Sequence, residues 1–289
     1  MKFEISSSLK VLKLIEIFKM IKHLGSYCTL FCKEDYIYIQ CMDGSHVCLL
    51  DVKIMDKWFD SYEGEEEMIS FGSGSIVKIL NLYQPKTKIV IDTDKNKETL
   101  NIELNYPDNI EKYFKLPLID IDTELLEPGE NDYAMEITMK TKTLDKYVTE
   151  LMMFGEVISI RCKDDKLLFN SSSNEGNYTI NVPHDNIEEF VVDEDVKLRA
   201  KIDAKHLSLI TKFFCVFKTI DLKVDNNFPL KVRFSDCGET ANNSDEEDNE
   251  SNAEELLQIT YFIAPKTDDG EEDEDYDSDD LGSVENEVV

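Results

Sequence analysis

Apolar residues between Leu9 and Leu24 recur every three or four positions, for example at Val11, Leu14 and Phe18. This spacing is typical of an amphipathic helix. We predict three further helices, over residues 73–83, 141–155 and 204–214.

Each predicted helix is followed by three short runs rich in β-branched, aromatic or other apolar residues. They cover 26–32, 36–42 and 46–52 after the first helix, 87–93, 99–105 and 112–119 after the second, 157–162, 166–170 and 177–182 after the third, and 219–224, 230–234 and 256–263 after the fourth. In the second half of the chain, a run also precedes each helix, at 133–139 and 195–202. Such runs, separated by turn residues, are typical of adjacent antiparallel strands. Four helix-plus-three-strand units in two similar halves predict an α+β fold, with the helices on one face of large antiparallel sheets.

The length of 289 residues exceeds what one small core usually holds, and a hydrophobic content of 42% is enough to fill two. An acidic segment containing Pro and Gly, IDTELLEPGEND, separates the two halves. The domains that we predict are 1–120, then a connector over 121–132, then 133–266 with an acidic insertion over 238–254, and finally a tail over 267–289.

The formal charge of −30 is unevenly distributed along the chain. From Asp236 to the C-terminus there are 21 acidic residues and one lysine, whereas the preceding 235 residues carry a net charge of only −10. Acidic segments poor in apolar residues cannot bury enough surface to offset the entropy of ordering. We therefore predict disorder over 241–251 and 268–280.

Seven cysteines, an odd number without a CxxC pair, indicate a reduced, intracellular chain. A basic N-terminal segment followed by an apolar stretch is missing, and nowhere do eighteen apolar residues follow one another. Neither export nor membrane insertion is predicted. We expect no cofactor, no metal ion and no membrane partner.

Lysines recur on the predicted solvent side of all four helices. At about 100° per residue, the outward residues are Lys13, Lys19 and Lys22 in the first helix, Lys78 in the second, Lys146 in the third, and Lys205 and Lys212 in the fourth. In so acidic a chain, this recurrence indicates one shared positive surface. Duplex DNA, with one charge about every 1.7 Å of its axis, is a natural partner for it. Because no base-reading motif accompanies the lysines, the contact is expected to be independent of sequence.

The stretch QCMDGSHVCLL, residues 40–50, places Asp43, Ser45 and His46 within four positions. A catalytic triad is normally assembled from residues far apart in the chain, so that each side chain can point at the next. Adjacent turn residues cannot easily do so. We expect Asp43 to bond nearby backbone groups and the stretch to form a surface that a partner grips.

Several stretches, in the same order and spacing, resemble the proliferating cell nuclear antigen family, the eukaryotic sliding clamps. They are QCMDGSHVCLL followed by FDSY, then SIVKIL, LIDIDTELLEPGENDY, GEVISIRCKDDKLLFNSSSNEGN and YFIAPK. The resemblance covers residues 1 to about 267, apart from the acidic insertion. It implies a head-to-tail trimeric ring, whose twelve helices line a channel for duplex DNA and which has no catalytic residues.

The resemblance also implies particular sites. The channel residues would be the lysines named above, with Asn81, Thr149 and Met153 where the family often carries a basic or imidazole side chain. A docking groove would be formed by Met42, His46, Val47, Leu49, Leu126, Pro128, Pro229, Phe262, Ile263, Ala264 and Pro265. Residues 111–119 would pair with 174–182 of a neighbouring subunit, with Phe114 and Tyr178 in the contact.

The resemblance implies a DNA polymerase processivity factor that tethers a polymerase, a flap nuclease and a ligase through the groove, in replication and in DNA repair. A clamp loader would have to open the ring, because this chain has no GxxxxGK[ST] loop. The protein would work in the nucleus, or at a cytoplasmic site where its genome replicates.

Three alternatives remain open. One is a checkpoint-type clamp subunit of a heterotrimer. Another is a metal-dependent nuclease built on the abundant carboxylates. The third is an acidic chaperone function of 236–289. For the insertion and tail, one hypothesis is that their charge repels stray DNA from the outside of the protein. Ser244 and Ser278, each followed by acidic residues, resemble acidic-directed kinase sites.

Overall fold

The computed structural model describes residues 1–266 except 95, 97, 122, 164, 165, 175, 194, 195 and 238–253. The predicted insertion, apart from Glu254, and the predicted tail lie outside the described residues, and so do Ser244 and Ser278. None of the helices in the described ranges is long and apolar enough to cross a membrane.

Four α-helices occur in the described ranges: α1 (Ser8–Leu24), α2 (Ser73–Leu80), α3 (Thr141–Leu151) and α4 (Ala204–Thr211). All four were predicted, but α2, α3 and α4 end three or four residues earlier than expected. The end of the fourth predicted helix is a separate 3-10 turn, η3 (Lys212–Cys215). After α3 the chain turns at Gly155, where a Cβ atom would lie only 2.7 Å from the backbone oxygen of Ser172. Glycine permits this close approach of the two backbones.

The largest sheet has nine strands and spans both halves of the chain. Its order is β14 (Ile187–Val192), β10 (Met135–Lys140), β16 (Thr219–Val224), β17 (Leu230–Cys237), β18 (Glu255–Ile263), β4 (Cys48–Met55), β3 (Tyr36–Met42), β2 (Tyr27–Cys32) and β6 (Glu67–Gly72). The halves join where β18 pairs antiparallel with β4, from Leu257 opposite Ile54 to Ile263 opposite Cys48. The last described strand is therefore built into the sheet of the first half.

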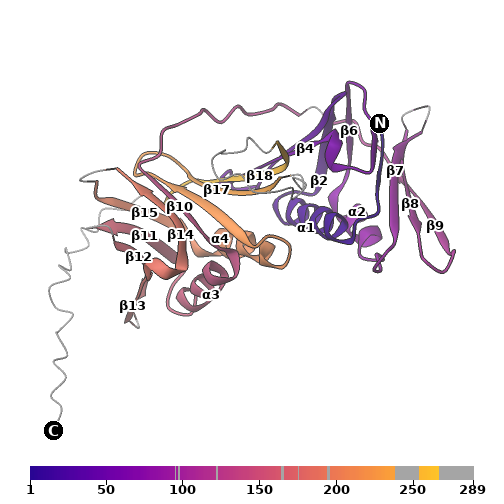
Figure 1. Cartoon of the computed structure of the whole chain (residues 1–289). Helices are drawn as coiled ribbons and strands as arrows, with labels where there is room; N and C mark the ends of the chain where they lie inside the picture. Colours follow the sequence, from indigo (N-terminus) through magenta and orange to yellow (C-terminus); the bar gives the residue numbers. More distant parts are fainter. Residues whose placement is uncertain are drawn as a thin grey trace, which may run out of the picture.

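Two smaller antiparallel sheets lie at opposite ends of the molecule (Figure 1). The first has the order β5 (Ser61–Glu63), β1 (Lys2–Ile5), β7 (Lys88–Thr93), β8 (Thr99–Asn105) and β9 (Glu111–Pro117). The second has the order β13 (Gly176–Asn181), β12 (Lys166–Ser173), β11 (Val157–Lys163) and β15 (Leu198–Asp203). Figure 1 shows all four helices gathered on one side of the sheets. The predicted α+β fold, with the helices on one face of large antiparallel sheets, is confirmed.

Four strands, β1, β5, β6 and β14, were not predicted from the sequence. β1 and β5 contain only four and three residues. Strands this short do not show a recognisable alternation of apolar and polar residues. β14 reads IEEFVV, and its two adjacent glutamates interrupt the apolar run. With β1 and β6 included, a strand precedes each of the four helices. In the first half of the chain, the repeated unit therefore begins with a strand and not, as predicted, with the helix.

Alternating side chains of the strands and one face of each helix form the core between the layers. Helix α1 packs beside α2, and α3 packs beside α4. Next to η3, the rings of Phe213, Phe217, Phe234 and Tyr261 form an aromatic cluster with centroid distances of 5.2 to 6.2 Å. This cluster brings η3 against β17 and β18, so the helical layer is fixed to the strands that join the two halves.

Candidate functional site

A hollow of about 380 Å³ lies where the β3–β4 loop, the connector and the end of β18 meet. We call it the connector groove; its lining residues are Met42, His46, Val47, Leu49, Leu126, Glu127, Pro128, Gly129, Asn131, Tyr133, Pro229, Phe262 and Ala264. Three of its segments lie far apart in the sequence. They meet because β18 pairs with β4, and because the Ala264 N–H donates to the Val47 oxygen at 2.8 Å.

Nine of the eleven residues that the resemblance assigned to a groove line this hollow. Ile263 does not, because successive side chains of a strand point to opposite faces. Phe262 faces the groove, so Ile263 is fully buried in the core. Pro265, which follows the end of β18, is half-buried and also lies outside the lining. We correct the prediction for both residues.

Four lining residues were missed: Glu127, Gly129, Asn131 and Tyr133, all from the connector or the residue after it. The Tyr133 hydroxyl donates to the Pro229 oxygen at 3.1 Å, and its ring packs edge-on against Phe228. Tyr133 therefore holds the end of the connector against the β16–β17 loop. The sequence did offer a signal for Tyr133. An aromatic residue next to an otherwise acidic connector is expected to bury its ring against the folded domain.

Asp43 organises the β3–β4 loop. Its carboxylate accepts hydrogen bonds from the backbone N–H groups of Val47 at 2.8 Å and Cys48 at 2.6 Å, and from the Ser45 hydroxyl. Burial acts to raise the pKa of Asp43, but these hydrogen bonds outweigh it and lower the pKa to about 2. Asp43 thus serves the loop backbone, as predicted, and the loop presents His46 to the groove with a left-handed φ of 59°.

Gln40 attaches the connector to the sheet. Its side-chain amide donates to the Leu126 oxygen and accepts from the Leu126 N–H, both at 2.8 Å. The same amide donates to Asp51 at 2.9 Å, and Asp51 also accepts from the Tyr38 hydroxyl at 2.8 Å. Because Gln40 is itself buried, this two-way bond fixes the wall of the groove at one point of the connector. This role of Gln40 was not predicted from the sequence.

A second charged cluster ties the β3–β4 loop to α4. The imidazole of His206 lies between two carboxylates, with Nε2 3.6 Å from Asp43 and Nδ1 3.6 Å from Asp203. Asp203 also accepts from the Lys205 N–H at 2.9 Å and pairs with Lys266 at 3.2 Å. Burial opposes ionisation of Asp203, but Lys266 and the Lys205 N–H hold its pKa below the ordinary value. The groove loop is thereby linked to the second half of the chain.

The predicted lysine surface lies on the helices, but its charge is partly compensated. Lys22, Lys78 and Lys205 are exposed and have no ion pair among the described residues. Three others pair with carboxylates: Lys19 with Glu16 at 2.7 Å, Lys146 with Glu150 at 3.8 Å, and Lys212 with Asp145 at 2.9 Å. Lys142, which was missed, is also exposed and lies one helical turn from Lys146.

The prediction that Lys13 is exposed is wrong. Lys13 is only 5% exposed, its ammonium lies 2.7 Å from Asp236, and it stands 4.8 Å from the ring centroid of Phe217. Helical periodicity put Lys13 on the outward side of α1, but Asp236 of β17 and Phe217, both from the second half, cover it there. On α1, Leu9 and Leu12 are exposed instead.

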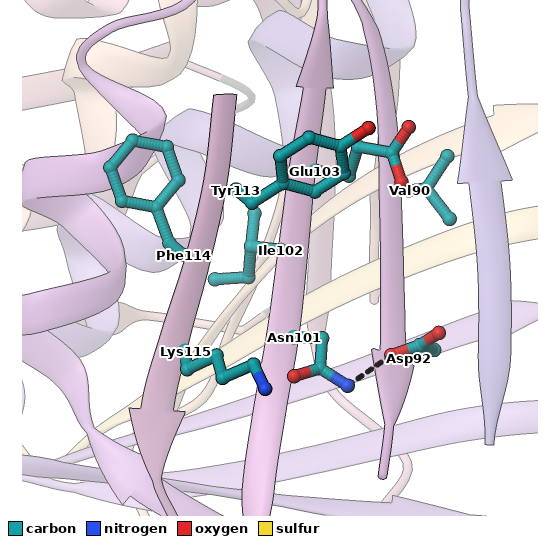
Figure 2. A pocket seen from close by; sticks show the side chains of 8 residues that line it. All are labelled: Val90, Asp92, Asn101, Ile102, Glu103, Tyr113, Phe114 and Lys115. Carbon is teal, nitrogen blue, oxygen red and sulfur yellow. Dashed lines mark hydrogen bonds between the residues drawn. The ribbon is translucent and has the colours of Figure 1, made fainter. Parts of the chain in front are cut away.

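Strands β9 and β13 are edge strands at opposite ends of the molecule (Figure 1). Tyr178 on β13 is half-buried and its ring stacks on Phe154, with centroids 4.8 Å apart. On β9, Phe114 packs against the core while Tyr113 is 65% exposed. Figure 2 shows the two rings on opposite sides of the strand, with Tyr113 over a hollow of about 150 Å³.

The chain matches known proteins over most of its length. Residues 2–125 match the family model described as proliferating cell nuclear antigen, N-terminal domain. A proliferating cell nuclear antigen of Chaetomium thermophilum is 26% identical over 261 residues, which is 87% of this chain and 93% of that protein. Proliferating cell nuclear antigen 1 of Plasmodium falciparum is 22% identical over 269 residues, 90% of this chain and 95% of that protein. The crystal structure of a protein of the same name from Thermococcus kodakaraensis superposes with a TM-score of 0.79 at 16% identity, covering 92% of this chain and 99% of that chain.

Proposed function

Because this chain belongs to the proliferating cell nuclear antigen family, we propose that it is a DNA sliding clamp that encircles duplex DNA as a homotrimeric ring. One observation carries the proposal. Two open strand edges lie at opposite ends of a layered molecule whose helices all gather on one side. Head-to-tail joining of such ends closes a ring when the rotation between neighbours is right, and it leaves the helices facing inward.

The subunit contact would join β9 of one copy to β13 of the next. An open edge carries unpaired backbone N–H and C=O groups, which a second edge satisfies by adding a strand. Apolar side chains near both edges support this pairing. Ile110, which is 50% exposed, lies just before β9, and Met153 beside the Phe154–Tyr178 stack is 76% exposed.

The lysines on the helices would then face the DNA. Because Lys19, Lys146 and Lys212 already pair with carboxylates, and because Lys13 is buried, attraction to phosphates should be weak. Encirclement does not depend on strong attraction, since a closed ring is retained on DNA by topology. A mobile, sequence-independent contact is what a sliding protein requires.

The connector groove would receive partner proteins: a DNA polymerase, a clamp loader, a flap nuclease and a ligase. Its apolar lining fits a short helical turn with aliphatic or aromatic anchors, and a few buried anchors supply most of the affinity in such contacts. The clamp itself would perform no chemistry. Its place of work would be where its genome replicates, in the nucleus or at a cytoplasmic site.

Light scattering of the purified chain tests the ring. We expect the mass of three subunits for the wild type, and a smaller mass for the double substitution Phe114→Ala plus Tyr178→Ala. Tyr113→Ala is the matched control, because it removes an aromatic ring from the other side of the same strand. If the wild type is a monomer at micromolar concentration, the homotrimer is refuted and a heteromeric clamp subunit is favoured.

Primer extension on a circular template, with a loader and a polymerase, tests the function. The wild type should lengthen the product made in each binding event, and Phe262→Ala should not, because it removes an anchor surface of the groove. Products of full length with the variant would contradict the assignment of the groove.

A further inference from the structure

The apolar floor of the connector groove leads to a cationic position. Phe262 on β18 lines the groove, together with Leu49 and Met42 on the next two strands. In the other direction across the sheet, Phe262 stands directly opposite Lys231 of β17, and Lys231 stands opposite Lys223 of β16. Residues directly opposite on antiparallel strands share a face, with their side chains about 5 Å apart. One row of side chains therefore runs from the floor of the groove to Lys231.

Lys231 borders the groove without belonging to its apolar lining. Its ammonium nitrogen lies 5.7 Å from the ring centroid of Phe262. Pro229, another lining residue, precedes Lys231 by two positions. Because Lys231 is half-buried, part of its side chain stays accessible to a partner that lies on Phe262.

The two cationic neighbours of Lys231 already have carboxylates of their own. Lys223 pairs with Glu136, and Arg233 pairs with Glu255. Within the described part of the chain, Lys231 makes neither an ion pair nor a hydrogen bond. Its ammonium group therefore has donors to offer to a partner, next to an apolar surface.

The surroundings of Lys231 disfavour its charge. Burial is the largest cause that lowers its pKa, and repulsion from Lys223 and Arg233 lowers it further. Glu130 in the connector and Glu136 on β10 act in the opposite direction, but the pKa stays below the ordinary value. A carboxylate brought by a partner would offset the repulsion and stabilise the charged form of Lys231.

We propose that Lys231 is a specificity-determining residue of the connector groove, where it receives the carboxylate of an Asp or Glu side chain of the partner. The proposal rests on the function proposed above, in which the groove holds a short helical turn of another protein. Residues three or four positions apart on a helix lie about 5–6 Å from each other, which matches the spacing of opposite residues on the sheet. The acidic residue therefore lies three or four positions from the anchor that contacts Phe262. Partners with this pattern are preferred over partners that carry the same anchor and a neutral or basic residue there.

Selection of short random peptides on the full chain tests the proposal, because it presupposes no particular partner. Groove binders are the peptides that bind the wild type and fail to bind Phe262→Ala. Among them we expect Asp or Glu to be enriched three or four positions from an apolar anchor. Selection on Lys231→Gln should abolish this enrichment, and selection on Lys231→Glu should replace it by Lys or Arg.

The matched control is Lys53→Gln. Lys53 is an exposed lysine of β4, and it points to the same face as Leu49, which is four residues away on the same strand. The substitution changes the total charge as Lys231→Gln does, but it lies far from the groove floor. Selection on Lys53→Gln should keep the acidic enrichment. Loss of the enrichment with both variants would show a general attraction by charge and overturn the proposal.

Calorimetry with one selected peptide gives the magnitude. Changing its acidic residue to the corresponding amide should weaken binding to the wild type about tenfold, the loss expected for one charge-assisted hydrogen bond. The same change should leave binding to Lys231→Gln nearly unaffected. Lys231→Arg keeps the charge and should keep the tenfold difference, so the test does not depend on one variant. An equal loss with the wild type and Lys231→Gln would show that another group attracts the carboxylate, and would overturn the proposal.

The outcomes separate this proposal from the function on which it rests. If no selected peptide depends on Phe262, the groove is wrongly assigned and both are overturned. If peptides depend on Phe262 but show no acidic preference, the role of Lys231 alone is refuted. A phosphoserine peptide that gains affinity over the amide peptide, where the carboxylate peptide gains none, would show a preference for phosphate and overturn the assignment to a carboxylate.

Discussion

Replacing Gln40 by methionine should release the connector without unfolding the protein. The substitution keeps the length and the apolar stem of the side chain but removes the two hydrogen bonds to Leu126, both 2.8 Å long, and the hydrogen bond to Asp51 within the sheet. A protein hydrogen bond contributes about 1 kcal/mol net, so local opening of the connector should become easier by about 2 kcal/mol. That corresponds to an opening equilibrium about 30-fold larger.

Amide hydrogen exchange measures this opening directly. The Leu126 N–H should exchange about 30-fold faster in Gln40→Met, while amides in the middle of β18 should be unaffected because they belong to the central sheet. Gln258→Met is the matched control, since Gln258 is a half-buried glutamine on β18 with no side-chain hydrogen bond to the connector in the described structure. Unchanged exchange at Leu126 would refute the reasoning that Gln40 holds the connector. This readout does not depend on any partner or on the proposed function.

Three further predictions follow from particular contacts. Asp43 has a pKa of about 2 against an ordinary 3.8, so its ionised form stabilises the fold above pH 3.8 by about 1–2 kcal/mol after allowance for solvent screening. Urea unfolding should show this stability lost as the pH falls toward 2. The substitution Asp43→Asn should flatten that pH dependence. Lys13→Met should lower the free energy of unfolding by about 2 kcal/mol because it leaves Asp236 without its buried partner. Adding Asp236→Asn to this variant should recover part of the lost stability. If the two substitutions lower the stability additively, the pairing is contradicted. Ile263→Ala should cost about 2–4 kcal/mol of stability because the side chain is fully buried. Phe262→Ala should cost less stability but should weaken the binding of a groove peptide, measured by calorimetry. If both substitutions affect stability and peptide binding equally, the assignment of the two side chains to opposite faces of β18 is contradicted.

The connector groove shows how far a resemblance in sequence extends. It placed nine residues correctly on one hollow, because ordered motifs carry the register of whole strands with them. It failed at Ile263, where a single step along the strand reverses the direction of the side chain, and at Pro265, which follows the end of β18. It also missed Gln40, because the importance of this residue lies in its contact with a segment 86 residues away.

The sequence by itself determined the local elements of this protein. Spacing of three and four located α1 to α4, alternation located most strands, and charge distinguished the acidic segments from the rest of the chain. These signals are local, since each depends on neighbours within about one turn or one strand. Only the tertiary structure decided that β18 completes the sheet of the first half and that Lys13 is buried under the second half. Each of these depends on packing between residues far apart in the chain, and periodicity carries no information on which distant surface will cover an outward side.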